Sequence, residues 1–179
     1  MSTKNIDTKD LTPNNIKDSA STNIKDSVAT NIKGSTPIDT KDSDPHEYFH
    51  IFIINYLLQA KDIPLSNEWI SEKDIPGGTT FFRGPHAIPT GLISSRFSGN
   101  IEQFKKICVQ LDGTSLEMAD AAYFFKITPR VSIAVLYWDG DDDFLPECKI
   151  LYDKSVIEHL ALDIIFALAV EVCTRIGKA

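Results

Sequence analysis

The chain has 179 residues, enough for one domain and rarely two, and 42% of them are hydrophobic, as in ordinary soluble proteins. Its 18 Lys and Arg face 25 Asp and Glu, and the net charge of −7 argues against nucleic acid or an anionic membrane as a partner. Because Cys108, Cys148 and Cys173 are too few for a disulfide framework, we expect core thiols, a reducing compartment and a cytoplasmic protein. No apolar segment follows residues 1–5, which predicts no secretory signal, and the longest apolar stretch, 160–170, is too short to span a bilayer.

Residues 1–44 contain an octapeptide repeat that begins at Asn15, recurs at Asn23 and continues in a decayed form from Asn31. Each repeat offers one Ile and no aromatic residue. Burying one Ile gains roughly 1.5–3 kcal/mol, whereas ordering each of its backbone residues costs about 1–2 kcal/mol. We therefore predict a disordered tail, followed by a single globular domain over 45–179.

The domain is predicted to begin with a helix. Asp44 is placed to cap it, Pro45 suits its first position, and Glu47 would close a capping box. The apolar pattern continues to about Ala60.

The next segment, 63–85, is rich in Pro and Gly and predicts a loop with a short turn at 67–71. Two helices should follow, one over 89–97 and one between an N-cap at Asn100 and a stop at Gly113.

The pattern then changes to strands. The apolar runs 121–127 and 131–138 flank Pro129 and predict a β-hairpin, and 149–152 predicts a third strand.

The last helix is expected to start at about Ser155 or Leu160 and to end at Ile176. It is apolar nearly all round, apart from a strip at Asp163, Glu171 and Arg175, which is typical of a central packing helix. Helices followed by strands and a final helix predict an α+β fold.

The predicted first helix begins with a literal His-Glu-x-x-His motif, in which His46 and His50 could hold Zn²⁺ and Glu47 could act as the base. Glu68 is a possible third ligand, in a stretch that resembles the corresponding segment of thermolysin-like zincins. Against a zinc peptidase, only the tail precedes the motif, where zincins have a sheet. The positive end of the helix dipole also disfavours a cation near His46.

Polar side chains in loops give other candidate ligand-binding residues. Arg83 and His86 share a Pro- and Gly-shaped loop, and Arg130 follows Pro129 at the hairpin tip. Asp141 and Asp142 lie in an acidic loop that lacks the spacing of a calcium loop. Each group also has a purely structural interpretation, as a helix cap or a solvated turn.

The domain contains a Pro-Arg hairpin at 129–130 and a Trp-x-Gly-Asp-Asp/Glu-x-Phe turn at 138–144. With further matches at 69–71, 75–78 and 150–155, these pieces make residues 49–172 resemble a prokaryotic family of unknown function, DUF3786. Some members resemble accessory proteins of anaerobic corrinoid or iron–sulfur metabolism, and some carry a Cys-rich cluster domain. This chain has no Cys run, so we expect no iron–sulfur cluster in it.

Family members usually carry further folded sequence where this chain has the repeat tail. The domain is therefore expected either to be truncated, with a partner covering the exposed face, or to function without the missing part.

The leading hypothesis is an accessory protein that binds a small ligand, a cofactor or a protein partner without catalysis of its own, through Arg83, His86, Arg130, Asp141 and Asp142. A homo-oligomer is compatible with it. The alternatives are a zinc peptidase that uses His46, His50, Glu68 and Glu47, and a degenerate paralogue without activity.

Overall fold

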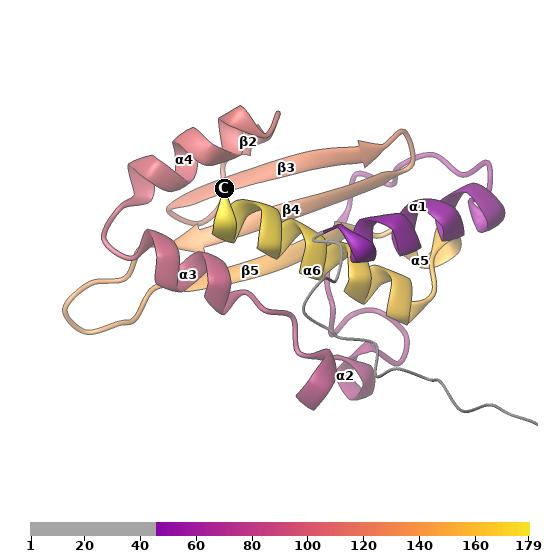
Figure 1. Cartoon of the computed structure of the whole chain (residues 1–179), viewed down its shortest axis with the longest axis horizontal. Coiled ribbons are helices and arrows are strands. Elements are labelled where there is room, and N and C mark those ends of the chain that lie inside the picture. The colour runs from indigo at the N-terminus through magenta and orange to yellow at the C-terminus, as the bar shows by residue number, and fades with distance from the viewer. Residues whose placement is uncertain (1–45) are drawn as a thin grey trace, which may run out of the picture. The chain divides into compact units, whose positions relative to one another are not determined.

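The structure is a computed structural model that describes residues 46–179, and the predicted repeat tail lies outside this range. A five-stranded sheet is covered by helices on one face (Figure 1). The elements in chain order are α1 (Glu47–Gln59), β1 (Trp69–Ser71), α2 (Gly78–Phe81), the 3₁₀ turn η2 (Gly84–His86), α3 (Gly91–Phe97), α4 (Ile101–Gln110), β2 (Thr114–Leu116), β3 (Ala121–Thr128), β4 (Val131–Trp138), β5 (Glu147–Asp153), α5 (Val156–His159) and α6 (Leu162–Lys178). None of the described helices is long and apolar enough to cross a membrane.

The sheet is antiparallel throughout and has the order β1-β5-β4-β3-β2. Its centre is the predicted hairpin, β3 and β4, in which Phe125 lies opposite Ile133. The predicted third strand is β5, which is longer than expected. The edge strands β1 and β2 have three residues each. The predicted α+β class is therefore confirmed.

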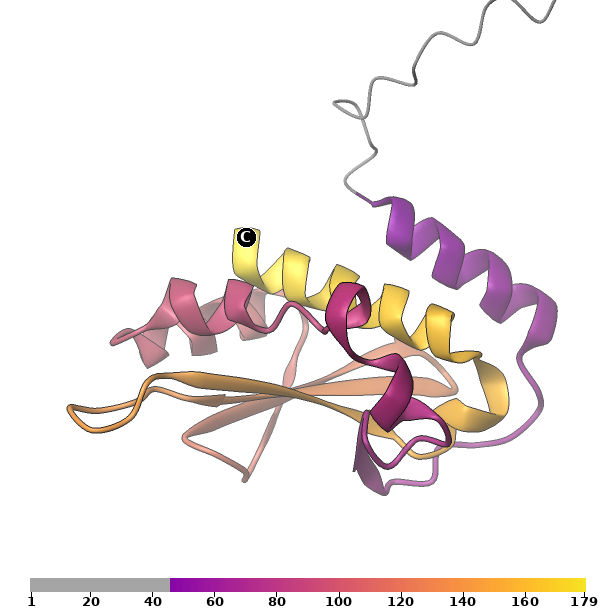
Figure 2. The same ribbon diagram turned by 90° about the horizontal axis from the view of Figure 1, so that it is seen from below.

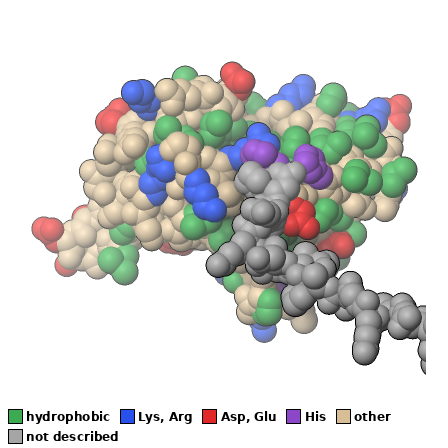
Figure 3. All heavy atoms as spheres, viewed as in Figure 1, with side chains coloured by type: hydrophobic (Ala, Val, Ile, Leu, Met, Phe, Trp, Pro, Cys, Tyr) green, Lys and Arg blue, Asp and Glu red, His purple; other side chains and the backbone are tan. Residues whose placement is uncertain are grey.

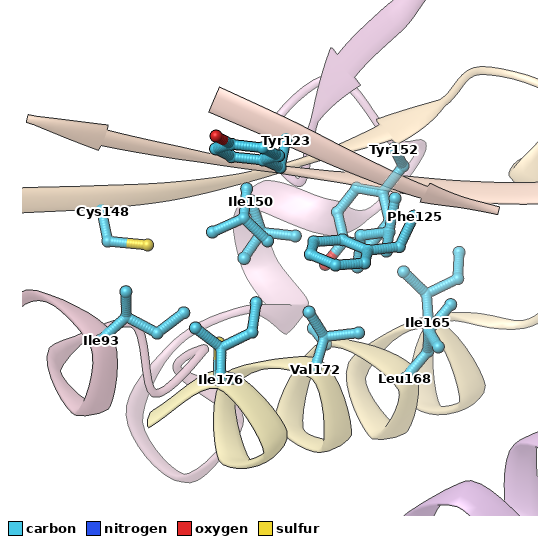
Figure 4. Packing of buried hydrophobic residues seen from close by; sticks show 14 of the residues in the cluster. Ile93, Tyr123, Phe125, Cys148, Ile150, Tyr152, Ile165, Leu168, Val172 and Ile176 are labelled. Atoms are coloured by element: carbon cyan, nitrogen blue, oxygen red, sulfur yellow. The ribbon is translucent and has the colours of Figure 1, made fainter. Parts of the chain in front are cut away.

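The core lies between the sheet and α6. Ile165, Leu168, Val172 and Ile176 of α6 point toward the side chains of β3 and β5 (Figure 4). Figure 2 shows α3, α4 and α6 in one layer above the sheet, with α1 lying outside α6. The final helix is a central packing helix, as its apolar pattern predicted.

The predicted turn at 67–71 is wrong, because Trp69–Ser71 form β1 and pair with Leu151–Asp153 of β5. A pairing between segments this far apart in the chain leaves no local signal. On the open face of the sheet, the Trp69 ring reaches across to Phe124 of β3, with 6.1 Å between ring centroids. This contact helps to bury the small side chain of Ala134.

The helix ends agree only in part with the predicted caps. Helix α1 begins at Glu47 with His46 at its N-cap and no side-chain cap, while Asp44 and Pro45 lie outside the described residues. Helix α4 has the predicted cap, because the Asn100 side chain accepts a hydrogen bond from the Gln103 N–H at 3.2 Å.

Two residues, Asp112 and Gly113, terminate α4, whereas the sequence predicted Gly113 alone. Asp112 takes the left-handed conformation, with φ of 60°, and the Gly113 N–H donates to the Cys108 carbonyl at 2.8 Å. A Cβ atom on Gly113 would lie 2.7 Å from that carbonyl oxygen, so a larger residue would not fit.

The buried carboxylate of Asp153 joins the loop before β1 to the end of β5. Its Oδ1 accepts hydrogen bonds from the backbone N–H and the hydroxyl of both Ser66 and Ser155, at 2.7–2.9 Å. Its Oδ2 accepts from the Asn67 N–H at 2.7 Å. Burial alone would raise the pKa of Asp153, but these hydrogen bonds outweigh burial and hold the pKa below its ordinary value.

We expect Asp153→Asn to lower the free energy of unfolding by about 2–3 kcal/mol at neutral pH. The NH₂ group of the asparagine side chain would face a backbone N–H group, so two hydrogen-bond donors would lie opposite each other. In the wild type, this stabilisation should be complete above the ordinary Asp pKa of about 4 and be lost as the pH falls through the lower folded pKa. The variant should lack this part of the pH dependence. Urea unfolding across this pH range measures both effects.

Asp142→Asn is the matched control, because it removes the same charge from an exposed loop position. Equal unfolding free energies for the two variants would contradict the role given to Asp153.

Candidate functional site

Helix α1 has apolar side chains on two opposite faces. Its inner face packs on the core through Phe52, which is fully buried, with Phe49, Ile53 and Tyr56 beside it. Its outer face, which we define as Tyr48, Ile51, Ile54, Leu57 and Leu58, is exposed.

The α1 outer face exposes large aliphatic groups without a charge among them. The side chains of Ile54, Leu57 and Leu58 are 57%, 76% and 77% exposed. No charged residue occurs from Ile51 to Gln59. Figure 3 shows hydrophobic side chains gathered over this part of the molecule, on the right. A contiguous apolar patch of this kind is typical of a protein interaction site.

A second candidate surface runs along the outer edge of β5. A groove of about 440 Å³ lies between Glu147–Leu151, the residues Ser71–Lys73 that end and follow β1, and the segment 82–90 before α3. We call it the β5-edge groove. It combines apolar walls, including Phe82 and Ile88, with charged residues such as Glu147 and Lys149, which form an exposed ion pair at 3.1 Å.

Within residues 46–179, the outer edge of β5 has no strand partner from Glu147 to Ile150. The Lys154 N–H donates to the Glu68 carbonyl at 2.8 Å, which makes this a hydrogen-bonded pair of the antiparallel ladder. Every second residue of a strand points its N–H and C=O groups to the same edge. Cys148 and Ile150 therefore point theirs to the edge that Lys154 shares with β1, which is the side of the groove. Within residues 46–179, β1 pairs there only with Leu151–Asp153. The remaining edge is a template for another extended chain.

Cys148 beside the groove is not an activated nucleophile. Its side chain is buried on the core side, and burial raises the pKa of its thiol well above the ordinary value. Burial likewise raises the pKa of Cys108 and Cys173 to about 12. All three thiols are buried and unbridged, as expected from the sequence.

The His-Glu-x-x-His motif begins a helix that is fastened to α6. The Nδ1 atom of His46 lies 3.0 Å from the Oε1 atom of Glu171, which also accepts from the Arg175 Nε–H at 2.6 Å. Of the predicted polar strip, Glu171 is only 3% exposed, whereas Asp163 is exposed. Arg175 in turn lies over the Phe49 ring, 4.7 Å from its centroid.

The proposed third zinc ligand is engaged elsewhere. Glu68 forms an ion pair with Lys154 at 3.0 Å, beside the start of β1. Over residues 46–179, no group of three or more His, Cys, Asp or Glu side chains is arranged to hold a metal ion.

Arg83 and His86 lie at the two ends of the exposed turn η2. The His86 ring stacks on Phe81 with 4.5 Å between centroids and meets the edge of Phe166 of α6 at 5.4 Å. These contacts give His86 a packing role between η2 and α6.

Arg130 and the acidic loop lie at opposite ends of β4, a strand of eight residues that spans roughly 25 Å. Arg130 forms an ion pair with Asp62. Asp141 closes its own turn by accepting hydrogen bonds from the N–H groups of Asp143 and Phe144, both at 2.9 Å. Asp142 is exposed. The structure thus does not bring the predicted ligand-binding residues into one site.

The sequence analysis did not predict that three buried polar residues hold separate segments together by hydrogen bonds. These residues are Asp153, Glu171 and His159. The His159 ring accepts a hydrogen bond from the Lys61 N–H at 3.3 Å. Burial, and then the nearby charge of Arg130, lower the pKa of His159. Only the polar strip of the apolar last helix, in which Glu171 is the one acidic residue after the first turn, indicated Glu171 in advance.

These features define the class: a small α+β protein with an exposed apolar helix face and an open strand edge. A family model, "Domain of unknown function (DUF3786)", matches residues 27–175. The chain therefore belongs to this family, and the match begins further toward the N-terminus than the predicted residue 49. No curated protein matches the chain. No solved structure matches it either.

The contact between His46 and Glu171 can be tested by a double-mutant cycle. We expect His46→Ala and Glu171→Gln to show a coupling of about 1 kcal/mol in the free energy of unfolding, because His46→Ala removes the contact and Glu171→Gln removes the charge that strengthens it. Lys61→Ala is the control partner for Glu171→Gln, since Lys61 pairs with Glu158 at the other end of α1. Additive effects of His46→Ala and Glu171→Gln would show that the histidine does not fasten the helix.

Proposed function

We propose that the protein is a non-catalytic accessory protein of the cytoplasm, and that it binds a protein partner through the α1 outer face. The exposure of Ile54, Leu57 and Leu58 on one surface is the observation that carries this proposal. The metabolic setting, which the family resemblance implies to be anaerobic corrinoid or iron–sulfur chemistry, belongs to the same proposal.

The arrangement of α1 supports a binding role. A helix with apolar side chains on both faces is normally buried on both, yet Ile54, Leu57 and Leu58 of α1 are exposed while Phe52 on the other face is buried. Burying a Leu side chain gains roughly 1.5–3 kcal/mol, so two exposed leucines and an isoleucine are a substantial source of binding free energy. The lack of charge from Ile51 to Gln59 calls for a partner with an apolar groove or helix face.

The other hypotheses receive less support from the observed contacts. A small-ligand site at the five predicted loop residues would need groups that lie at opposite ends of β4 to converge. For the zinc peptidase, Glu68 and His46 already have partners in Lys154 and Glu171.

The test compares affinity capture by the tagged full chain with capture by a Leu57→Glu, Leu58→Glu double variant in extracts of the source cells. We expect the wild type to retain one protein in stoichiometric amount and the double variant to lose at least about 90% of it, since two buried charges would abolish an apolar contact. Hydrogen exchange of the purified complex should then show α1 protected.

Val109→Glu is the control, because Val109 is an exposed aliphatic residue, 59% exposed, that lies on α4 instead of α1. Unchanged thermal unfolding of all variants establishes that they fold. Equal capture by the double variant, or a complex in which α1 exchanges as in the free protein, would refute the proposal.

A further inference from the structure

The loop between β4 and β5 places apolar side chains next to the unpaired strand edge. Phe144 and Leu145 are 74% and 90% exposed and lie just before Glu147, where β5 begins. Figures 1 and 2 both show this loop projecting beyond the end of the sheet. In Figure 3 the projection, at the left, carries acidic and hydrophobic side chains. One strand thus has an apolar projection at one end and the β5-edge groove along its side.

The sequence of β5 is complementary to itself. An antiparallel pair of two β5 edges can be centred on Cys148, which then faces Cys148 of the other copy through the outward N–H and C=O groups of both. Glu147 of each copy then lies opposite Lys149 of the other, twice per pair. Opposite charges at facing positions stabilise strand pairing, and like charges oppose it. A pair centred on Glu147 or on Lys149 would place like charges opposite each other.

The flanking residues suit the same register. Ile150 meets Pro146 of the other copy, where the proline carbonyl can accept from the Ile150 N–H. Pro146 has no N–H of its own, so no backbone donor of Pro146 is left without an acceptor. The next position, Leu151, already pairs with Ser71 of its own chain, so the strand pairing of the two copies ends at Ile150.

We infer that a second copy of this chain binds along the β5-edge groove and forms a two-fold dimer, in which one antiparallel sheet continues through both copies. The charges of Glu147 and Lys149 favour a second copy as the partner. A second antiparallel β5 places its Lys149 opposite Glu147 and its Glu147 opposite Lys149. The dimer uses a surface other than the α1 outer face. It therefore goes beyond the proposed function and does not depend on it.

The test uses two single charge reversals of the full chain, Glu147→Lys and Lys149→Glu. Each places like charges opposite each other twice in the dimer, so we expect the dissociation constant to rise at least about tenfold in each variant alone. An equimolar mixture of the two variants restores both opposite-charge pairs, and should recover the dimer mass. Sedimentation velocity over a concentration series measures the wild type, each variant and the mixture.

Lys126→Glu is the matched control, since it makes the same charge change at an exposed position of β3 and should dimerise like the wild type. A wild type that stays monomeric over the series would overturn the inference. So would a mixture that stays monomeric, as expected if the edge binds an unrelated peptide. Thermal unfolding confirms that every variant is folded.

Discussion

The packing of α6 against one face of the sheet is the constraint on which the other features depend. The central strands direct large buried side chains, among them Phe125, Tyr137 and Tyr152, to that face, and α6 packs on them with a nearly continuous apolar surface. The described helices leave the opposite face to side chains such as Trp69 and Phe124. With the inner layer filled by α3, α4 and α6, α1 lies against a helix instead of the sheet.

This arrangement explains the positions of the α1 outer face and the β5-edge groove. Helix α1 buries only the stripe that meets α6, and a histidine at its start is held by the buried Glu171 carboxylate. Strand β1 covers only part of the edge of β5, because the chain turns away after Ser71. Because helices cover one face of the sheet, an apolar face of α1 and part of the β5 edge stay uncovered by residues 46–179. Both kinds of surface are suited to binding another protein chain.

Sequence patterns predicted the features that depend on local periodicity. The hairpin of β3 and β4, the Asn100 cap and the packing role of the last helix were all readable from neighbouring residues. Strand β1 was not predictable in this way, because its partner residues lie 80 to 84 positions away in the chain. The same holds for Asp153 and Glu171, which are recognisable only once their donors are known. The His-Glu-x-x-His motif shows the converse, since its first histidine contacts a glutamate from a distant helix.

The stability of the domain resides in the layer formed by α6 and the sheet, and α1 is an outer helix held by one stripe of contacts. Native-state hydrogen exchange of the full chain tests this most directly. We predict that amides of β4 and α6 exchange only through global unfolding, and that those of α1 open at a lower free energy. Amides of α1 that exchange as slowly as those of α6 would contradict the account.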